Sequence, residues 1–114
     1  MSFSYLATPY SKYPGGIEAA HREACRAAAM LVKAGVGVYS PIAHTHPIAI
    51  YGGIDPLNHD IWLPADTPMM QAASSITVVK MKGWQESVGV AHEIKAFQEM
   101  GKPVFYMEWV DEGT

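Results

Sequence analysis

The chain has 114 residues, of which 49% are hydrophobic and 17% are charged, and its formal net charge is −3. This composition predicts one globular domain over residues 1–114 and excludes a disordered chain. The acidic charge disfavours a nucleic-acid duplex as a partner, and no apolar run is long enough to suggest a membrane span. No secretory leader is visible, and the only cysteine, Cys25, cannot form an internal disulfide, so a cytoplasmic location is expected. Cys25 itself is expected to be a small buried hydrophobe.

Short apolar runs alternate with stretches of helical periodicity along the chain. In chain order the sequence predicts a strand at 3–7, a helix at 17–34, a strand at 36–39, a helix at 66–73, a strand at 76–79, a helix at 87–100 and a strand at 103–107. The segment 42–64 is rich in proline and is expected to form a long loop or short irregular helices. Asp66 is expected to cap the helix that follows it.

Strands that alternate with helices predict a doubly wound α/β fold of the flavodoxin or Rossmann-like kind, a three-layer sandwich with a four- or five-stranded parallel sheet. In such sheets ligands bind beyond the carboxyl ends of the strands. The loops after the strands and the start of the helix at 87–100 are therefore expected to converge on one ligand site. The expected substrate contacts on these segments are Thr8, Pro9, Tyr10, His44, Trp84, Ser87 and Gly89.

An acid interrupts the apolar face of the last predicted helix. At about 100° per residue, Val90, Ile94 and Phe97 form one stripe, and Glu93 falls inside that stripe. An ionised carboxylate on a buried face is costly unless it is hydrogen-bonded or lines a cavity. Glu93 is therefore a candidate nucleophile or general base. A structural acid paired with a buried donor is the alternative interpretation.

The start of the same helix is suited to an anion. Ser87 is a good N-cap, and Gly89 permits the close approach of a ligand to the backbone. The first amide groups of a helix have no partner within the helix and attract negative charge. Ser87 either caps the helix only or also contacts an anionic group of a ligand.

Three segments of the chain form a further pattern. They are residues 5–11 at the end of the first strand, Asp66 with Met70 and Ser74 before the third strand, and residues 83–89 leading to Glu93. In this order they resemble the nucleoside 2-deoxyribosyltransferase superfamily, near its 2'-deoxynucleoside 5'-phosphate N-glycosidase branch. A group of small uncharacterised bacterial and phage proteins in that superfamily is similar as well.

The resemblance implies a role for each matching residue. Glu93 corresponds to the nucleophile that attacks the anomeric carbon of the sugar, Asp66 to the acid that assists departure of the base, and Tyr5 to the tyrosine near the nucleophile. Ser87 stands where the glycosidase branch carries a serine that meets a 5'-phosphate. The expected reaction is therefore hydrolysis, or alternatively transfer, at the N-glycosidic bond of a nucleotide or nucleoside, with retention and without a cofactor. The expected assembly is a homodimer or a larger homo-oligomer.

Other interpretations stay open. His44, His46 and His59 match no standard zinc spacing and no cysteine pair accompanies them, so no metal site is expected. Trp62 is expected to plug an edge of the core, whereas Trp84 is a candidate for stacking on a base. Outside the resemblance, Asp66 is only a helix cap. The alternative functions are a nucleotide-binding sensor without catalysis and a structural or interaction protein.

Overall fold

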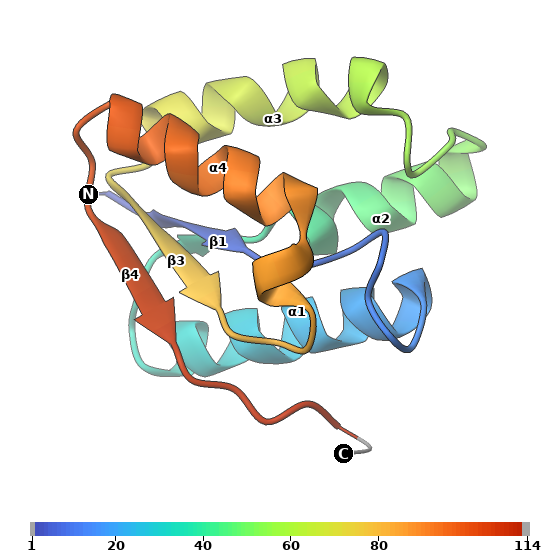
Figure 1. The fold of residues 1–114 in the computed structure, drawn as a ribbon, viewed down its shortest axis with the longest axis horizontal. Helices are drawn as coiled ribbons and strands as arrows, with labels where there is room; N and C mark the ends of the chain where they lie inside the picture. Colours follow the sequence, from blue (N-terminus) through green and yellow to red (C-terminus); the bar gives the residue numbers. More distant parts are fainter. Residues whose placement is uncertain (1, 113–114) are drawn as a thin grey trace.

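The computed structural model describes residues 2–112 and contains a four-stranded parallel sheet in the order β2-β1-β3-β4 (Figure 1). In chain order the elements are β1 (Ser4–Ala7), α1 (Ile17–Lys33), β2 (Val38–Tyr39), α2 (Pro41–Gly52), α3 (His59–Ala72), β3 (Ser75–Val79), the 3-10 helix η1 (Trp84–Glu86), α4 (Val88–Glu99) and β4 (Val104–Met107). The predicted three-layer α/β fold is confirmed, with four strands in the sheet.

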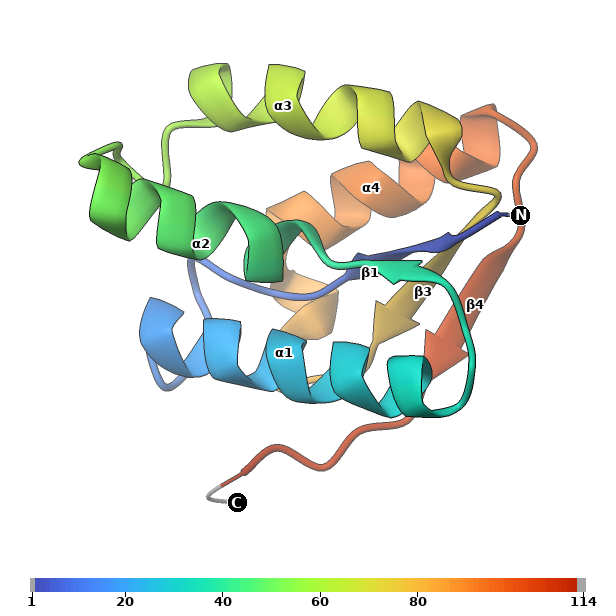
Figure 2. The ribbon, with the colours of Figure 1, turned by 180° about the vertical axis from the view of Figure 1, so that it is seen from behind.

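Helices cover both faces of the sheet. Helix α1 lies against one face, and α3 and α4 lie over the other, while α2 continues beyond the end of β2 and packs on α1 (Figures 1 and 2). The central strand β1 is buried along its whole length, as expected for a parallel strand with helices on both sides. Its two neighbours β2 and β3 run in the same direction. All three carboxyl ends therefore open at one edge of the sheet, where most of the predicted site residues gather.

The proline-rich segment 42–64 is helical over most of its length, so of the two predicted alternatives the long loop is wrong and the helices are present. Helix α2 begins at Pro41, behind an N-cap in which the Ser40 hydroxyl accepts a hydrogen bond from the amide of Ala43. Proline fits this first position because the amide it lacks has no partner within a helix. Helix α3 begins seven residues before Asp66, at His59, and is capped by Asn58. Asp66 thus lies inside the helix and does not cap it.

Pro47 lies inside α2 and frees one carbonyl group of that helix. A residue at this position would normally donate its amide to the carbonyl four residues earlier, which is the carbonyl of Ala43. That oxygen accepts a hydrogen bond from the ring of His21 on α1. The proline thus creates an acceptor at the α1–α2 contact.

Hydrogen bonds attach the segment after β4 to the rest of the protein. The Trp109 indole donates a hydrogen bond of 2.8 Å to the Glu23 carboxylate on α1. The buried carboxylate of Asp111 accepts hydrogen bonds from the Tyr13 hydroxyl and from the backbone amide of Lys82. Tyr13 follows β1 and Lys82 follows β3, so this tail joins the two loops that leave the centre of the sheet.

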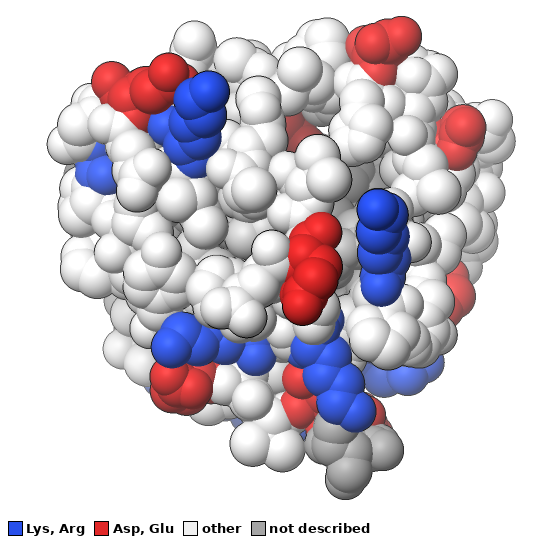
Figure 3. Space-filling view, in the orientation of Figure 1, with Lys and Arg blue, Asp and Glu red and all other residues white. Residues whose placement is uncertain are grey.

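Charged groups are sparse and mixed on the surface. Figure 3 presents a face on which lysine and arginine are scattered among acids, without a continuous basic patch. Cys25 is exposed on α1, which corrects the expectation that it is buried. Among residues 2–112, no helix combines the length and the apolar character needed to cross a lipid bilayer.

Candidate active site

A cleft opens at the carboxyl edge of the sheet. Its wall is formed by the loop after β1, the start of α2, the side of α3 and the start of α4. The cleft is open to solvent at its mouth. The lining combines aromatic and aliphatic side chains with the carboxyl groups of Asp66 and Glu93. This composition is typical of a site for a small, partly apolar ligand.

Tyr5 and Glu93 form a hydrogen-bonded pair on the floor of the cleft. The Tyr5 ring is fully buried on β1, with the rings of Phe97 and Tyr39 at centroid distances of 5.6 and 5.9 Å. These contacts fix the direction of its hydroxyl, which donates a 2.8 Å hydrogen bond to Oε2 of Glu93. The carboxyl group on the apolar face of α4 is therefore held by a donor and also lines the cleft, in agreement with both conditions set out from the sequence.

Two buried oxygens in the cleft have no hydrogen-bond partner. They are Oδ1 of Asp66 and Oγ1 of Thr8, and they are the side-chain atoms for which this holds among the described residues. Thr8 follows β1 and Asp66 comes from the middle of α3, and both residues line the cleft. Since buried polar atoms are nearly always paired with protein, water or ligand atoms, these two oxygens are available to a molecule that enters the cleft.

Burial governs the ionisation of the two cleft carboxyl groups. Desolvation raises the pKa of Glu93 to about 8, assisted by the nearby charge of Asp66 and opposed by the hydrogen bond from Tyr5. Desolvation also raises the pKa of Asp66 to about 6, while the charge of His44 acts to lower it. The hydrogen bond from Tyr5 favours the charged form of Glu93, but the loss of hydration outweighs it.

The two groups share one proton near neutral pH. Because they interact, they titrate as a pair, and between about pH 6 and pH 8 that pair holds one proton and one negative charge. Burial favours the neutral form of both groups, and the pKa of Glu93 is raised further than that of Asp66. A ligand that brings positive charge next to Glu93, or a proton acceptor next to Asp66, moves the proton to Asp66. The cleft thus supplies one carboxylate and one carboxylic acid together.

The raised pKa of Glu93 has a consequence for stability. Between its ordinary pKa of 4.5 and the folded-state value of about 8, the folded protein holds a proton that the unfolded chain releases. Raising the pH through this window therefore favours unfolding, and the loss ends above about pH 8. We expect urea denaturation to give a lower free energy of unfolding at pH 8 than at pH 5. The variant Glu93→Gln should have a flatter dependence, and an equal slope in both proteins would contradict the assignment.

The start of α4 forms the third part of the cleft. Ser87 caps the helix by accepting a 3.2 Å hydrogen bond from the amide of Val90, and Ser87, Val88 and Gly89 line the cleft. The serine hydroxyl keeps its own hydrogen for a second partner. Gly89 has no side chain to fill the space beside that hydroxyl, since an added Cβ would meet Ser87 Oγ at 3.9 Å. Capping and anion binding are therefore compatible at this serine.

One family model matches the sequence over residues 2–109, which is nearly the whole chain, and its description is "Domain of unknown function (DUF1937)". The chain belongs to the DUF1937 family. Among curated proteins no sequence matches it. The chemistry of this DUF1937 protein must therefore be inferred from the cleft itself.

In this DUF1937 protein most of the predicted site residues meet in the cleft, and three do not. Tyr5, Thr8, Tyr10, Asp66, Ser87, Gly89 and Glu93 line the cleft. Pro9 is fully buried beside it, and Trp84 packs on the core and on Tyr106. His44 lies against the Tyr39 ring and acts on the cleft only through its charge near Asp66.

The structure adds residues that the sequence did not place in the ligand site. Trp62 lines the cleft, so the tryptophan expected to plug the core is the one placed to contact a ligand. His92 lines it beside Glu93, and His59 lines it from the first turn of α3. The helical start at His59 explains both Trp62 and His59, because it turns a supposed loop into one wall of the cleft. Trp62 and His59 could have been predicted at the cleft only by continuing the helical pattern across the prolines of this segment.

Proposed function

We propose that this protein cleaves the N-glycosidic bond of a nucleotide or nucleoside, with Glu93 as the nucleophile. The observation that carries the proposal is the Glu93 carboxyl group, held by the Tyr5 hydroxyl at 2.8 Å on the wall of a cleft that also contains the unpaired carboxyl oxygen of Asp66. The resemblance to the nucleoside 2-deoxyribosyltransferase superfamily supports it, because the same three residues match the functional positions of that superfamily.

The reaction requires one ionised and one protonated carboxyl group in the cleft. Breaking an N-glycosidic bond builds positive charge on the sugar, which a neighbouring carboxylate stabilises and traps as a covalent intermediate. In the proposed step the Glu93 oxygen forms a bond to the anomeric carbon while the bond from that carbon to the base nitrogen breaks. Asp66 gives its proton to the departing base. Water then attacks the intermediate, Asp66 takes a proton from that water, and the sugar leaves with its configuration retained.

A phosphorylated substrate is the favoured class, because Ser87 and the start of α4 offer a hydroxyl and free amide groups to an anion. We expect Ser87→Asp to weaken binding of a nucleoside monophosphate by roughly ten- to hundredfold, since it replaces a hydrogen bond to a charged group by repulsion. Aspartate caps helices as well as serine does, so the variant should remain folded.

The unphosphorylated nucleoside provides the matched comparison. Its affinity for wild type and for Ser87→Asp should be equal, as measured by isothermal titration calorimetry, because it carries no charge to repel. An equal loss for nucleoside and nucleotide would mean that the start of α4 does not bind the phosphate. A stability measurement by thermal denaturation confirms that the cap is retained.

The function itself is tested by base release. Wild-type protein is incubated with the four 2'-deoxynucleoside monophosphates and with the four ribonucleotides, and the free base is separated by chromatography. Release of a base from one of these substrates is the expected result. A raised melting temperature with a nucleotide, without any product, would replace the proposal by the alternative of a nucleotide-binding sensor.

We also propose that the protein forms a homo-oligomer in the cytoplasm. Exposed apolar residues border the cleft, with Val88 at 71%, Leu57 at 46% and Leu63 at 44% exposed, and a second copy covering them would close the cleft to water. Exposed Cys25 fits a reducing compartment. Light scattering at micromolar concentration is expected to give at least the mass of a dimer, and a monomer mass would contradict this assembly.

A further inference from the structure

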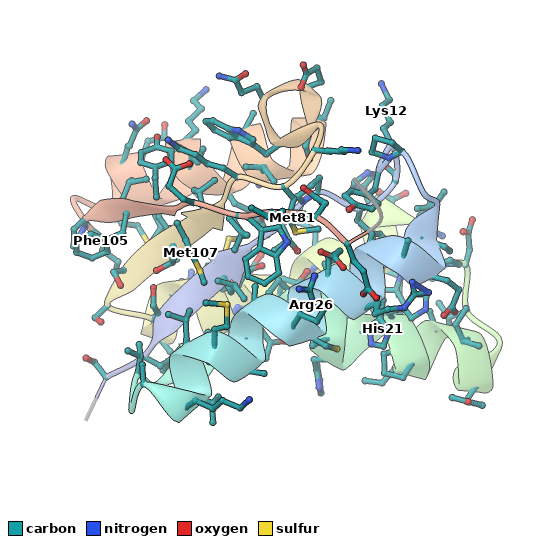
Figure 4. The ribbon with its side chains drawn as sticks, turned by 90° about the horizontal axis from the view of Figure 1, so that it is seen from below. Lys12, His21, Arg26, Met81, Phe105 and Met107 are labelled. Atoms are coloured by element: carbon teal, nitrogen blue, oxygen red, sulfur yellow. The ribbon has the colours of Figure 1, made fainter. Side chains whose placement is uncertain are left out.

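A cluster of potential metal ligands lies at the contact between α1 and α2, outside the cleft. A carboxylate oxygen of Glu18 and one ring nitrogen each from His21 and His46 lie within 4.8 Å of one another. Glu18 and His21 are one helical turn apart on α1, and His46 faces them from α2. Figure 4 places His21 on the side of α1 that borders α2. This grouping could not be found from the sequence, because 24 residues, which include the strand β2, separate the two histidines.

Each ligand is already oriented by a neighbour. His46 is 3% exposed, with Nε2 2.8 Å from the Glu18 carboxylate and Nδ1 2.5 Å from the Tyr10 hydroxyl. A ring N–H of His21 donates to the Ala43 carbonyl that Pro47 leaves free. Metal-binding histidines usually have such a partner on their second nitrogen, because it fixes the ring and the tautomer.

We propose that Glu18, His21 and His46 bind a divalent transition-metal ion of the zinc type. Two imidazoles and one carboxylate form a ligand set that suits Zn²⁺ and leaves a fourth position for water or another ligand. The cation takes the place of the hydrogen on Nε2 of His46, whose Nδ1 then donates to the Tyr10 oxygen. Glu18 is mostly exposed, so the ion reaches the site from solvent.

Ion binding requires one local movement. The His21 and His46 rings are stacked, with centroids 4.4 Å apart and an angle of 26° between their planes, and a metal ion lies in the plane of each ring that binds it. His21 is the partly exposed ring of the two, so it turns toward the ion while buried His46 stays in place. The fourth position is left to water, because Cys25, whose sulfur lies 3.5 Å from His21 Nε2, is not within 4.8 Å of all three ligand atoms.

The proposed ion is structural for the cleft and not part of its chemistry. None of its three ligands lines the cleft, but Tyr10, bonded to His46, does. A bound ion therefore fixes α1 against α2 and holds the Tyr10 side chain at the cleft wall. This role is independent of the N-glycosidase proposal, and either can fail alone.

The test uses Zn²⁺ alone and the full-length protein freed of metal by chelation. Calorimetry at pH 7.5 is expected to give one Zn²⁺ per chain, and the ion should raise the melting temperature. Glu18→Gln and His21→Ala should each weaken binding at least tenfold, since each removes a ligand. Tyr10→Phe, which removes only the partner of His46, should weaken it by roughly ten- to hundredfold.

His59→Ala is the matched control, because it removes an exposed histidine that is outside the cluster. Its affinity for Zn²⁺ should equal that of wild type. The proposal is overturned if wild type binds no Zn²⁺, or if Glu18→Gln and His21→Ala bind it as tightly as His59→Ala. Circular dichroism of each variant without metal verifies that weaker Zn²⁺ binding does not result from unfolding of the variant.

Discussion

Replacing Glu93 by glutamine is expected to reduce base release by roughly 10³-fold or more, because an amide cannot form the covalent bond to the anomeric carbon. Glutamine has nearly the same shape as glutamate and its carbonyl oxygen can still accept the hydrogen bond from Tyr5, which is 2.8 Å in the native pair. The variant should therefore bind the substrate while failing to turn it over. Single-turnover kinetics with saturating nucleotide separate these two effects.

Glu99→Gln is the matched control, since Glu99 is an exposed acid on the same helix. It should have the wild-type rate. The melting temperature of Glu93→Gln at pH 8 should equal or exceed that of wild type, because the variant removes a poorly solvated charge. If base release by Glu93→Gln were slower than that of wild type by less than about tenfold, Glu93 would be ruled out as the nucleophile.

Asp66→Asn is expected to lower the rate by roughly 10²- to 10⁴-fold, the contribution of a positioned acid. It should also change the pH profile. In wild type the active pair has one proton, so the rate should peak between the pKa values of about 6 and about 8. Without Asp66 only Glu93 titrates and only its ionised form reacts, so the rate should rise with pH and then level off.

A substrate with a good leaving group distinguishes this role from a structural one. A nitrophenyl group departs without a proton, so the 5'-phosphorylated nitrophenyl deoxyriboside should be cleaved by Asp66→Asn almost as fast as by wild type. An equal loss for both substrates, or an unchanged fall in rate above pH 8, would show that Asp66 does not protonate the base.

The regular parts of the fold were predictable from local pattern. Each strand is a short apolar run, and the periodicity of α4 places Glu93 on the same face as Val90 and Phe97, both of which are buried. The N-cap at Ser87 was predictable as well, because capping depends on residues adjacent in sequence. These features depend on interactions within one turn of helix or one strand, which a sequence displays directly.

The wall formed by α2 and α3 was not predictable in the same way. Pro47, Pro64 and Pro68 all lie inside helices, although proline usually ends or kinks a helix. Packing of α2 on α1 and of Met70 in the core compensates for the missing hydrogen bonds. Such compensation comes from contacts distant in sequence. The position of Trp62 in the cleft and of Trp84 outside it follows from the same contacts.

The segment after β4 contributes to the shape of the cleft. Asp111 ties the loop after β1 to the loop after β3, and the loop after β1 also contributes Thr8 and Tyr10 to the cleft wall. The segment 109–112 therefore stabilises the geometry that the cleft wall presents to a ligand, through its contacts with α1 and with these two loops.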